Sequence, residues 1–118
     1  MENLIVTLPT PLRQVLDLID VNCLGIAFVV DGDGIMQGVV TDGDIRRAFL
    51  RGVTLDTIVE AVMIRNFVSL PVTADRATIF AALKDPIRLI PLLDADRRPV
   101  DYASFGRHHR IPVAERSE

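Results

Sequence analysis

The sequence predicts a mixed α/β (α+β) fold of two similar halves, each a small sheet packed against two helices, related by a pseudo-two-fold axis. Two observations lead to this prediction. The chain repeats itself at an offset of 63 residues, and each copy alternates apolar runs of strand length with amphipathic segments. The repeat needs no gap, and its apolar positions agree better than its few identities. The aligned pairs include Thr10 with Thr73, Leu16 with Ile79, Ile26 with Leu89, and Asp31 with Asp94.

Local signals predict the first elements of the first copy. Thr10 is a candidate helix N-cap, with Pro11 at the first helical position. The continuous apolar run Leu24–Val30 indicates a strand that is covered on both faces. Asp31-Gly32-Asp33-Gly34 is a strong hairpin turn, so Ile35–Val40 is expected to be the returning strand.

Two helices are expected after the hairpin. Asp44–Arg51 predicts a short helix that ends at Gly52. A linker helix is expected next, because five apolar residues recur at helical spacing: Leu55, Ile58, Val59, Val62 and Met63.

The second copy begins at Phe67-Val68 and repeats the same order of elements. We expect a helix at about Asp75–Lys84, strands near Leu89–Leu93 and Val100–Ala103, and a turn over Asp94–Arg98. The helical pattern fails after residue 105, and the polar, proline-broken segment that follows is typical of an interdomain linker. The expected domains are a first repeat over 1–63 including the linker helix, a degenerate second repeat over 64–107, and a linker or tail over 108–118.

The composition excludes several classes of function. A net charge of −3, aromatic residues at 5% and the absence of Trp argue against a nucleic-acid partner. The apolar runs are too short to span a bilayer, and no signal-peptide pattern is visible. The single cysteine, Cys23, can form no internal disulfide. We therefore expect a soluble cytoplasmic protein without a membrane partner.

The segment most informative about function is 38–47, where a strand ends at Thr41 and a helix begins. Backbone N–H groups at a helix start, here around Asp42 and Gly43, attract anions, and the Thr41 hydroxyl can donate to a phosphate. Asp44 can accept hydrogen bonds from the two hydroxyls of a ribose. Arg46 or its neighbour Arg47 can offset phosphate charge.

The same segment has a purely structural interpretation. Thr41 or Asp42 can cap the helix, Asp44 can favour its positive end, and the two arginines can be a solvated face. The segment alone leaves both interpretations open.

The motif Gly38-Val39-Val40-Thr41-Asp42-Gly43-Asp44-Ile45, the repeat and the boundary Glu60-Ala61-Val62-Met63 together resemble a CBS-domain pair, or Bateman module. The resemblance covers about residues 4–107. It implies a regulatory module that binds AMP, ADP, ATP or a related adenosine ligand in a cleft between the repeats. Thr41 would contact phosphate and Asp44 would bind the ribose, while Thr10 and Gly25-Ile26-Ala27 would line the base pocket. Such pairs commonly dimerise into a flat disc, so a homodimer is expected.

The second copy departs from this motif. Ser104 stands where the first copy has Thr41, but Arg107 stands where it has Asp44. Arginine has only donors and cannot accept ribose hydroxyls, so a second site of the same kind is doubtful. Arg107 and Arg88 are candidates to reach phosphate in the first site or in a dimer mate, or are surface charges.

A narrower resemblance concerns the enzyme that the module would regulate. Asn66–Pro71, Ile87–Asp94 and Val100–Ser104 are similar to the CBS pairs that precede sugar-phosphate nucleotidyltransferases, and His109–Val113 resembles the joint to that catalytic domain. The Gly-rich loop followed by Arg of that enzyme is absent from the 118 residues. The expected partner is therefore a fused or associated nucleotidyltransferase domain.

No catalytic or metal site is expected in this chain. Turn chemistry accounts for the pairs Asp31/Asp33 and Asp94/Asp96, and His108-His109 lacks the spacing of a zinc site. No acid, base and nucleophile assemble, although an enzyme acting on nucleotides remains a distant alternative. The other alternative is a scaffold, in which the pair dimerises and holds catalytic domains together without a ligand.

Overall fold

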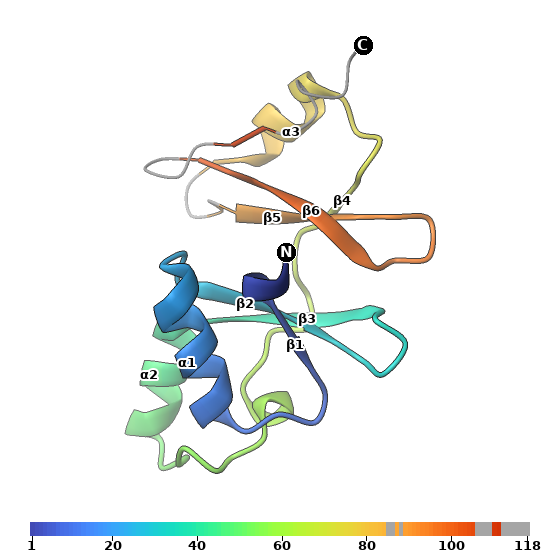
Figure 1. Ribbon diagram of the computed structural model, residues 1–118. Coiled ribbons are helices and arrows are strands. Elements are labelled where there is room, and N and C mark those ends of the chain that lie inside the picture. Colours follow the sequence, from blue (N-terminus) through green and yellow to red (C-terminus); the bar gives the residue numbers. More distant parts are fainter. Residues whose placement is uncertain (85–86, 88, 106–109, 112–118) are drawn as a thin grey trace. The chain divides into compact units, whose positions relative to one another are not determined.

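The computed structural model describes residues 1–84, 87, 89–105 and 110–111. The chain divides into two units, Met1–Phe67 and Val68–Glu118. Each unit contains its own three-stranded sheet (Figure 1). In the part that the structure describes, no helix is both long enough and apolar enough to cross a membrane.

The first unit is a sheet with two α-helices (Figure 1). Strand β2 is central, parallel to β1 and antiparallel to β3. The elements are η1 (Glu2–Leu4), β1 (Ile5–Thr7), α1 (Leu12–Asn22), β2 (Ile26–Val30), β3 (Met36–Thr41), α2 (Asp42–Leu50) and η2 (Val59–Ala61).

The core of the first unit lies between the sheet and the helices. Helix α1 buries Leu12, Val15 and Ile19, which share one helical face, and α2 buries Ile45 and Ala48. Four of the five residues of β2 are buried, as expected for a central strand covered on both faces.

The second unit repeats this plan with shorter elements. They are β4 (Leu70–Pro71), α3 (Arg76–Ala82), β5 (Leu89–Leu93) and β6 (Pro99–Ser104), with β5 central. A separate core cluster includes Ile79, Ile90 and Leu92. The predicted α/β class is confirmed, although the described residues of this unit include one α-helix and not the two expected in each half.

The two hairpins are equivalent at the predicted offset of 63 residues. Ile26 pairs with Thr41 in the first unit and Leu89 with Ser104 in the second, and both ladders shift register before their last pair. Each turn is fixed by one aspartate: Asp31 Oδ1 accepts from the N–H groups two and four residues ahead, and Asp94 Oδ1 does the same.

The gapless alignment is wrong for the first strand and helix of each copy. There the equivalent residues are 64 apart: Val15 and Ile79 are the buried residues at matching helix positions, and the helix N-caps are Pro11 and Asp75. The path from N-cap to central strand is thus one residue shorter in the second copy. The aligned pair Leu16 and Ile79 is therefore not structurally equivalent.

The predicted linker helix is also wrong. Only the short 3-10 turn η2 forms, although Val59 and Met63 are buried in the first core as the helical spacing predicts. The backbone of this segment bonds elsewhere: Val59 N–H donates to the Thr10 carbonyl, and Ile64 exchanges two hydrogen bonds with Val39 of β3. An extended chain across the sheet and the start of α1 therefore replaces the helix.

Thr10 is not the N-cap of α1. Pro11 holds that position, and no side chain caps the helix there. The Thr10 hydroxyl instead donates to the Thr7 carbonyl, which ties the loop back to the end of β1. Helix α2 begins at Asp42, two residues before the predicted start, and Gly52 follows its end with φ +105°, as the C-terminal signal predicted.

Candidate functional site

The turn between β3 and α2 is built by a reciprocal pair of hydrogen bonds between Thr41 and Asp44. The Asp44 N–H donates to Thr41 Oγ1 at 3.0 Å, and the Thr41 N–H donates to Asp44 Oδ2 at 3.0 Å. This capping box satisfies two backbone donors at the helix start. The hydroxyl therefore acts as an acceptor here, and its own hydrogen stays available to donate.

The Asp44 carboxylate is engaged on both oxygens. Oδ1 accepts from Arg47 Nη2 at 3.0 Å, one turn further along α2, and the Asp44 side chain is 17% exposed. A carboxylate offers about four lone-pair positions. Two protein donors leave room for further hydrogen bonds, so the structural role of Asp44 is established without closing it to a ligand.

Gly25 and Ile26 lie beside this turn, at the start of β2. Ile26 pairs with Thr41, and the Asp42 N–H donates to the Gly25 carbonyl at 3.0 Å. Gly25 has φ +77°, which favours glycine, and a Cβ there would lie 3.7 Å from Asp42 Oδ1. Gly25 thus permits the close approach of the two segments.

Ala27 and Thr10 do not join this group. Ala27 is fully buried in the first core, so its side chain lines no open site. Thr10 follows β1, whose last residue pairs with Val30 at the far end of β2 from Ile26. The strand between them spans on the order of 13 Å. Within the first unit these two side chains thus lie apart from Thr41, and their place in a nucleotide pocket stays a prediction.

Arg46 and Arg47 both bend back toward the first turn of α2. A Cβ on Gly43 would lie 3.3 Å from Arg47 Nη1 and 3.6 Å from Arg46 Nη2. The local charges are thus two carboxylates, Asp42 and Asp44, and two guanidinium groups. Among the described residues, Arg46 has no ion pair, so its charge is available to an anion near the start of the helix.

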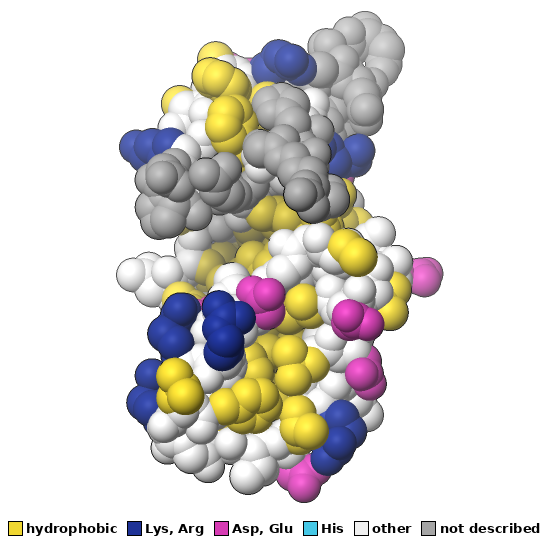
Figure 2. All heavy atoms as spheres, turned by 90° about the vertical axis from the view of Figure 1, so that its left-hand side faces the viewer, with side chains coloured by type: hydrophobic (Ala, Val, Ile, Leu, Met, Phe, Trp, Pro, Cys, Tyr) yellow, Lys and Arg dark blue, Asp and Glu magenta, His cyan; other side chains and the backbone are white. Residues whose placement is uncertain are grey.

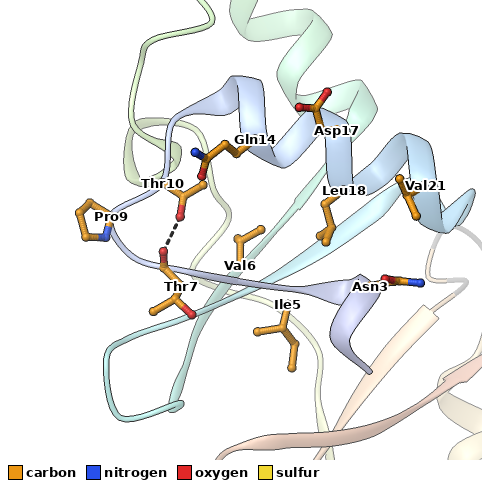
Figure 3. A pocket seen from close by; sticks show the side chains of 10 residues that line it. All are labelled: Asn3, Ile5, Val6, Thr7, Pro9, Thr10, Gln14, Asp17, Leu18 and Val21. Carbon is orange, nitrogen blue, oxygen red and sulfur yellow. Dashed lines mark hydrogen bonds between the residues drawn. The ribbon is translucent and has the colours of Figure 1, made fainter.

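Thr10 instead borders an open groove of about 700 Å³ between β1 and α1. Figure 3 shows Leu18 and Val21 of α1 directed toward β1, with Thr10 and Gln14 at one end and Asn3 at the other. Thr41 and Asp44 do not line this groove. Its lining residues are Asn3, Ile5, Val6, Thr7, Pro9, Thr10, Gln14, Asp17, Leu18 and Val21.

Sequence reasoning missed Asn22, which braces the start of β2. Its Nδ2 donates to the Asn3 carbonyl at 2.8 Å and to the Ile26 carbonyl at 3.1 Å, and its Oδ1 accepts from the Leu24 N–H. The signal was the type of residue: asparagine at a helix end often bonds nearby backbone. Asn22 therefore positions the strand end that lies against Thr41.

The second unit offers less of a site. Ser104 is the register equivalent of Thr41 and is buried, and its Oγ has no hydrogen-bond partner among the described residues. Its backbone exchanges two hydrogen bonds with Arg110. Arg88, Arg107 and His108-His109 lie outside the described residues. No group of three potential metal ligands occurs in residues 1–84, 87, 89–105 and 110–111.

Comparison with known proteins identifies the fold. The CBS domain family model matches residues 2–51. The CBS domain protein PAE2072 from Pyrobaculum aerophilum, complexed with AMP, is 20% identical with a TM-score of 0.73, over 95% of this chain and 91% of that chain.

Two further structures are similar. The Listeria monocytogenes CbpB protein in complex with c-di-AMP is 21% identical with a TM-score of 0.71, over 85% of this chain and 78% of that one. Staphylococcus aureus OpuCA is 17% identical with a TM-score of 0.71, over 86% and 84%. None of the curated proteins matches the sequence. The family model matches part of the first unit, and the structural neighbours show that the chain shares the fold of CBS domain proteins.

Proposed function

We propose that this chain is a regulatory module that binds an adenosine nucleotide, AMP, ADP or ATP, at the start of α2 and thereby controls an enzyme. The observation that carries the proposal is the turn in which Thr41 and Asp44 meet the start of β2 at Gly25 and Ile26. Any catalysis is assigned to a separate domain or partner.

Each residue of the turn has a role in this proposal. The hydrogen of the Thr41 hydroxyl and the Gly43 N–H group donate to a phosphate, and Arg46 supplies positive charge. Asp44 accepts from the ribose hydroxyls, which compete with Arg47 at Oδ1. Gly25 and Ile26 offer backbone groups to the base. Similar folds with AMP and with c-di-AMP support an adenosine ligand.

The proposal is tested by titration calorimetry of the protein with AMP, ADP and ATP, comparing wild type with Asp44→Ala. Loss of the ribose hydrogen bonds is expected to weaken binding by about 1.5–3 kcal/mol, or roughly ten- to 150-fold. Asp20→Ala, an exposed acid on α1, is the matched control and should bind as wild type does. An unchanged dissociation constant in Asp44→Ala would show that Asp44 only begins the helix.

A ligand-free scaffold is the second candidate, favoured by one observation. Both oxygens of Asp44 already have protein partners, Thr41 and Arg47, so a capping role alone accounts for its position. If the chain is a scaffold, titration with millimolar nucleotide should release no heat and should not shift the unfolding temperature. The protein should still self-associate.

Homodimer formation is part of the proposal in either case. Figure 2 views the first unit from the side of its helices and shows hydrophobic side chains gathered on that face. Leu50 is 84% exposed, and Phe49 beside it and Val21 on α1 are also exposed. Apolar surface that gathers in this way marks interaction sites. We propose that a second copy covers it.

The regulated enzyme is proposed to be a sugar-phosphate nucleotidyltransferase, fused or associated. The support is the sequence resemblance of Asn66–Pro71 and Val100–Ser104 to the modules that precede such enzymes. Assaying a candidate nucleotidyltransferase with and without this module, at increasing AMP or ATP, tests the link. A rate independent of both module and nucleotide would reject it.

A further inference from the structure

We infer that Arg47 pairs with Asp44 when no ligand is bound and thereby makes the site selective for phosphorylated nucleosides over uncharged ones. In the absence of ligand its guanidinium occupies the carboxylate, and a ligand phosphate draws it away as the ribose binds. This inference rests on the proposed function.

Arg47 and Asp44 form an ion pair in which the arginine is the more exposed partner. Arg47 Nη2 lies 3.0 Å from Asp44 Oδ1, and the Arg47 side chain is 60% exposed while that of Asp44 is 17% exposed. The carboxylate is therefore held by the turn, while the guanidinium is the more exposed partner. An ion pair with this exposure is weak, so a ligand can replace it.

The Arg47 guanidinium lies close to the first turn of α2. Arg47 Nη1 lies 3.3 Å from the position of a Cβ on Gly43, so the group already rests on the first turn of α2. A phosphate bound by the Gly43 N–H group and the Thr41 hydroxyl would lie within a rotamer change of Arg47. Asp42 and Asp44 would otherwise repel such a phosphate, and Arg46 alone offsets only one of their charges.

Ligand binding would exchange the hydrogen-bond partners of Asp44 and Arg47. A ribose hydroxyl that donates to Asp44 Oδ1 competes with Arg47 for that oxygen and replaces its bond. With AMP, Arg47 finds a phosphate oxygen in return. With adenosine, Arg47 loses the carboxylate and gains nothing, so adenosine must compete with the ion pair without compensation.

The test is calorimetric titration of wild type, Arg47→Gln, Arg47→Lys and Arg51→Gln with AMP and with adenosine. Arg51, at the end of the same helix, controls for the loss of one charge. We expect Arg47→Gln to bind AMP about ten-fold more weakly and adenosine at least as tightly as wild type, because one charge-assisted bond is lost and Asp44 is freed. Arg47→Lys should recover part of the preference for AMP.

The outcomes separate the two proposals. If wild type binds AMP and the ratio of adenosine to AMP dissociation constants is the same in Arg47→Gln, this inference is overturned and the proposed function stands. An equal fall of that ratio in Arg51→Gln also overturns it, since general charge would then explain selectivity. If wild type binds neither compound nor any adenine nucleotide, the proposed function itself fails.

Discussion

Met63 packs directly against Gly38. A Cβ on Gly38 would lie 3.0 Å from Met63 Sδ and 2.9 Å from the Ile64 carbonyl oxygen. The segment after η2 can therefore cross β3 at Val39 only because residue 38 has no side chain. Gly38, before the Thr41 turn, and Met63, at the repeat boundary, thus contact each other.

Gly38→Ala is expected to destabilise the protein by about 1–3 kcal/mol, the usual effect of overpacking, because the clash includes backbone that cannot move freely. Chemical denaturation measures the change. Gly32→Ala is the matched control, since no atom of the described residues lies within 4 Å of a Cβ at that turn position. Equal stability of Gly38→Ala and wild type would mean that the crossing segment adjusts easily.

Removal of the Thr41 hydroxyl tests the capping box. Thr41→Val keeps the shape of the side chain but loses the acceptor for the Asp44 N–H, so about 1 kcal/mol of stability should be lost. Thr41→Ser should restore most of it. Amide hydrogen exchange in α2 locates the effect, which a loss spread evenly over the unit would contradict.

Gly43→Ala separates stability from binding. Alanine is the better helix former by up to about 1 kcal/mol, and the nearest atoms to its Cβ are the flexible ends of Arg47 and Arg46. The variant should therefore be at least as stable as wild type. Because the Arg47 guanidinium must then shift from the first turn of α2, AMP should bind more weakly, by up to several-fold, in a titration. Binding as tight as that of wild type would show that Arg47 does not need this position.

Much of the fold could be predicted because its signals are local. The Asp31 and Asp94 turns fix both hairpins, and their equivalence at 63 residues follows from identical strand and turn lengths. The shift by one residue before the hairpins could not be predicted, since Thr10 with Thr73 and Leu16 with Ile79 align plausibly at the wrong offset. An alignment of the two copies does not show which residues of each helix pack into the core.

The backbone conformation of the linker segment could not be predicted from its apolar spacing. Helical spacing correctly marked Val59 and Met63 as buried, but burial does not determine the backbone. Hydrogen bonds to Thr10 and Val39, both distant in sequence, decide the conformation. The site has the same limit: the sequence identified Thr41 and Asp44, but the ion pair of Asp44 with Arg47 needed the structure.

The helical face of the first unit provides a prediction on assembly. Leu50→Glu places a charge on the most exposed apolar residue of α2 and should shift the protein toward monomer, because burying an unpaired carboxylate is costly. Sedimentation velocity measures the change. Val100→Glu, an exposed residue of the second unit, is the control. A dimer that survives Leu50→Glu would assign self-association to another surface.

The N-cap of α3 predicts a pH dependence. Hydrogen bonds from Thr78, first from its side chain and then from its backbone N–H, lower the pKa of Asp75 below its usual 3.8. The ionised form is therefore favoured in the folded state. Its contribution to stability is complete above pH 3.8 and is lost as the pH falls through the lowered pKa. Thermal unfolding of wild type and Asp75→Asn should differ near neutral pH and converge as the pH falls below that range. Asp20→Asn, on an exposed part of α1, should show no such convergence. A constant difference between wild type and Asp75→Asn at every pH would mean that the charge of the cap does not stabilise the helix.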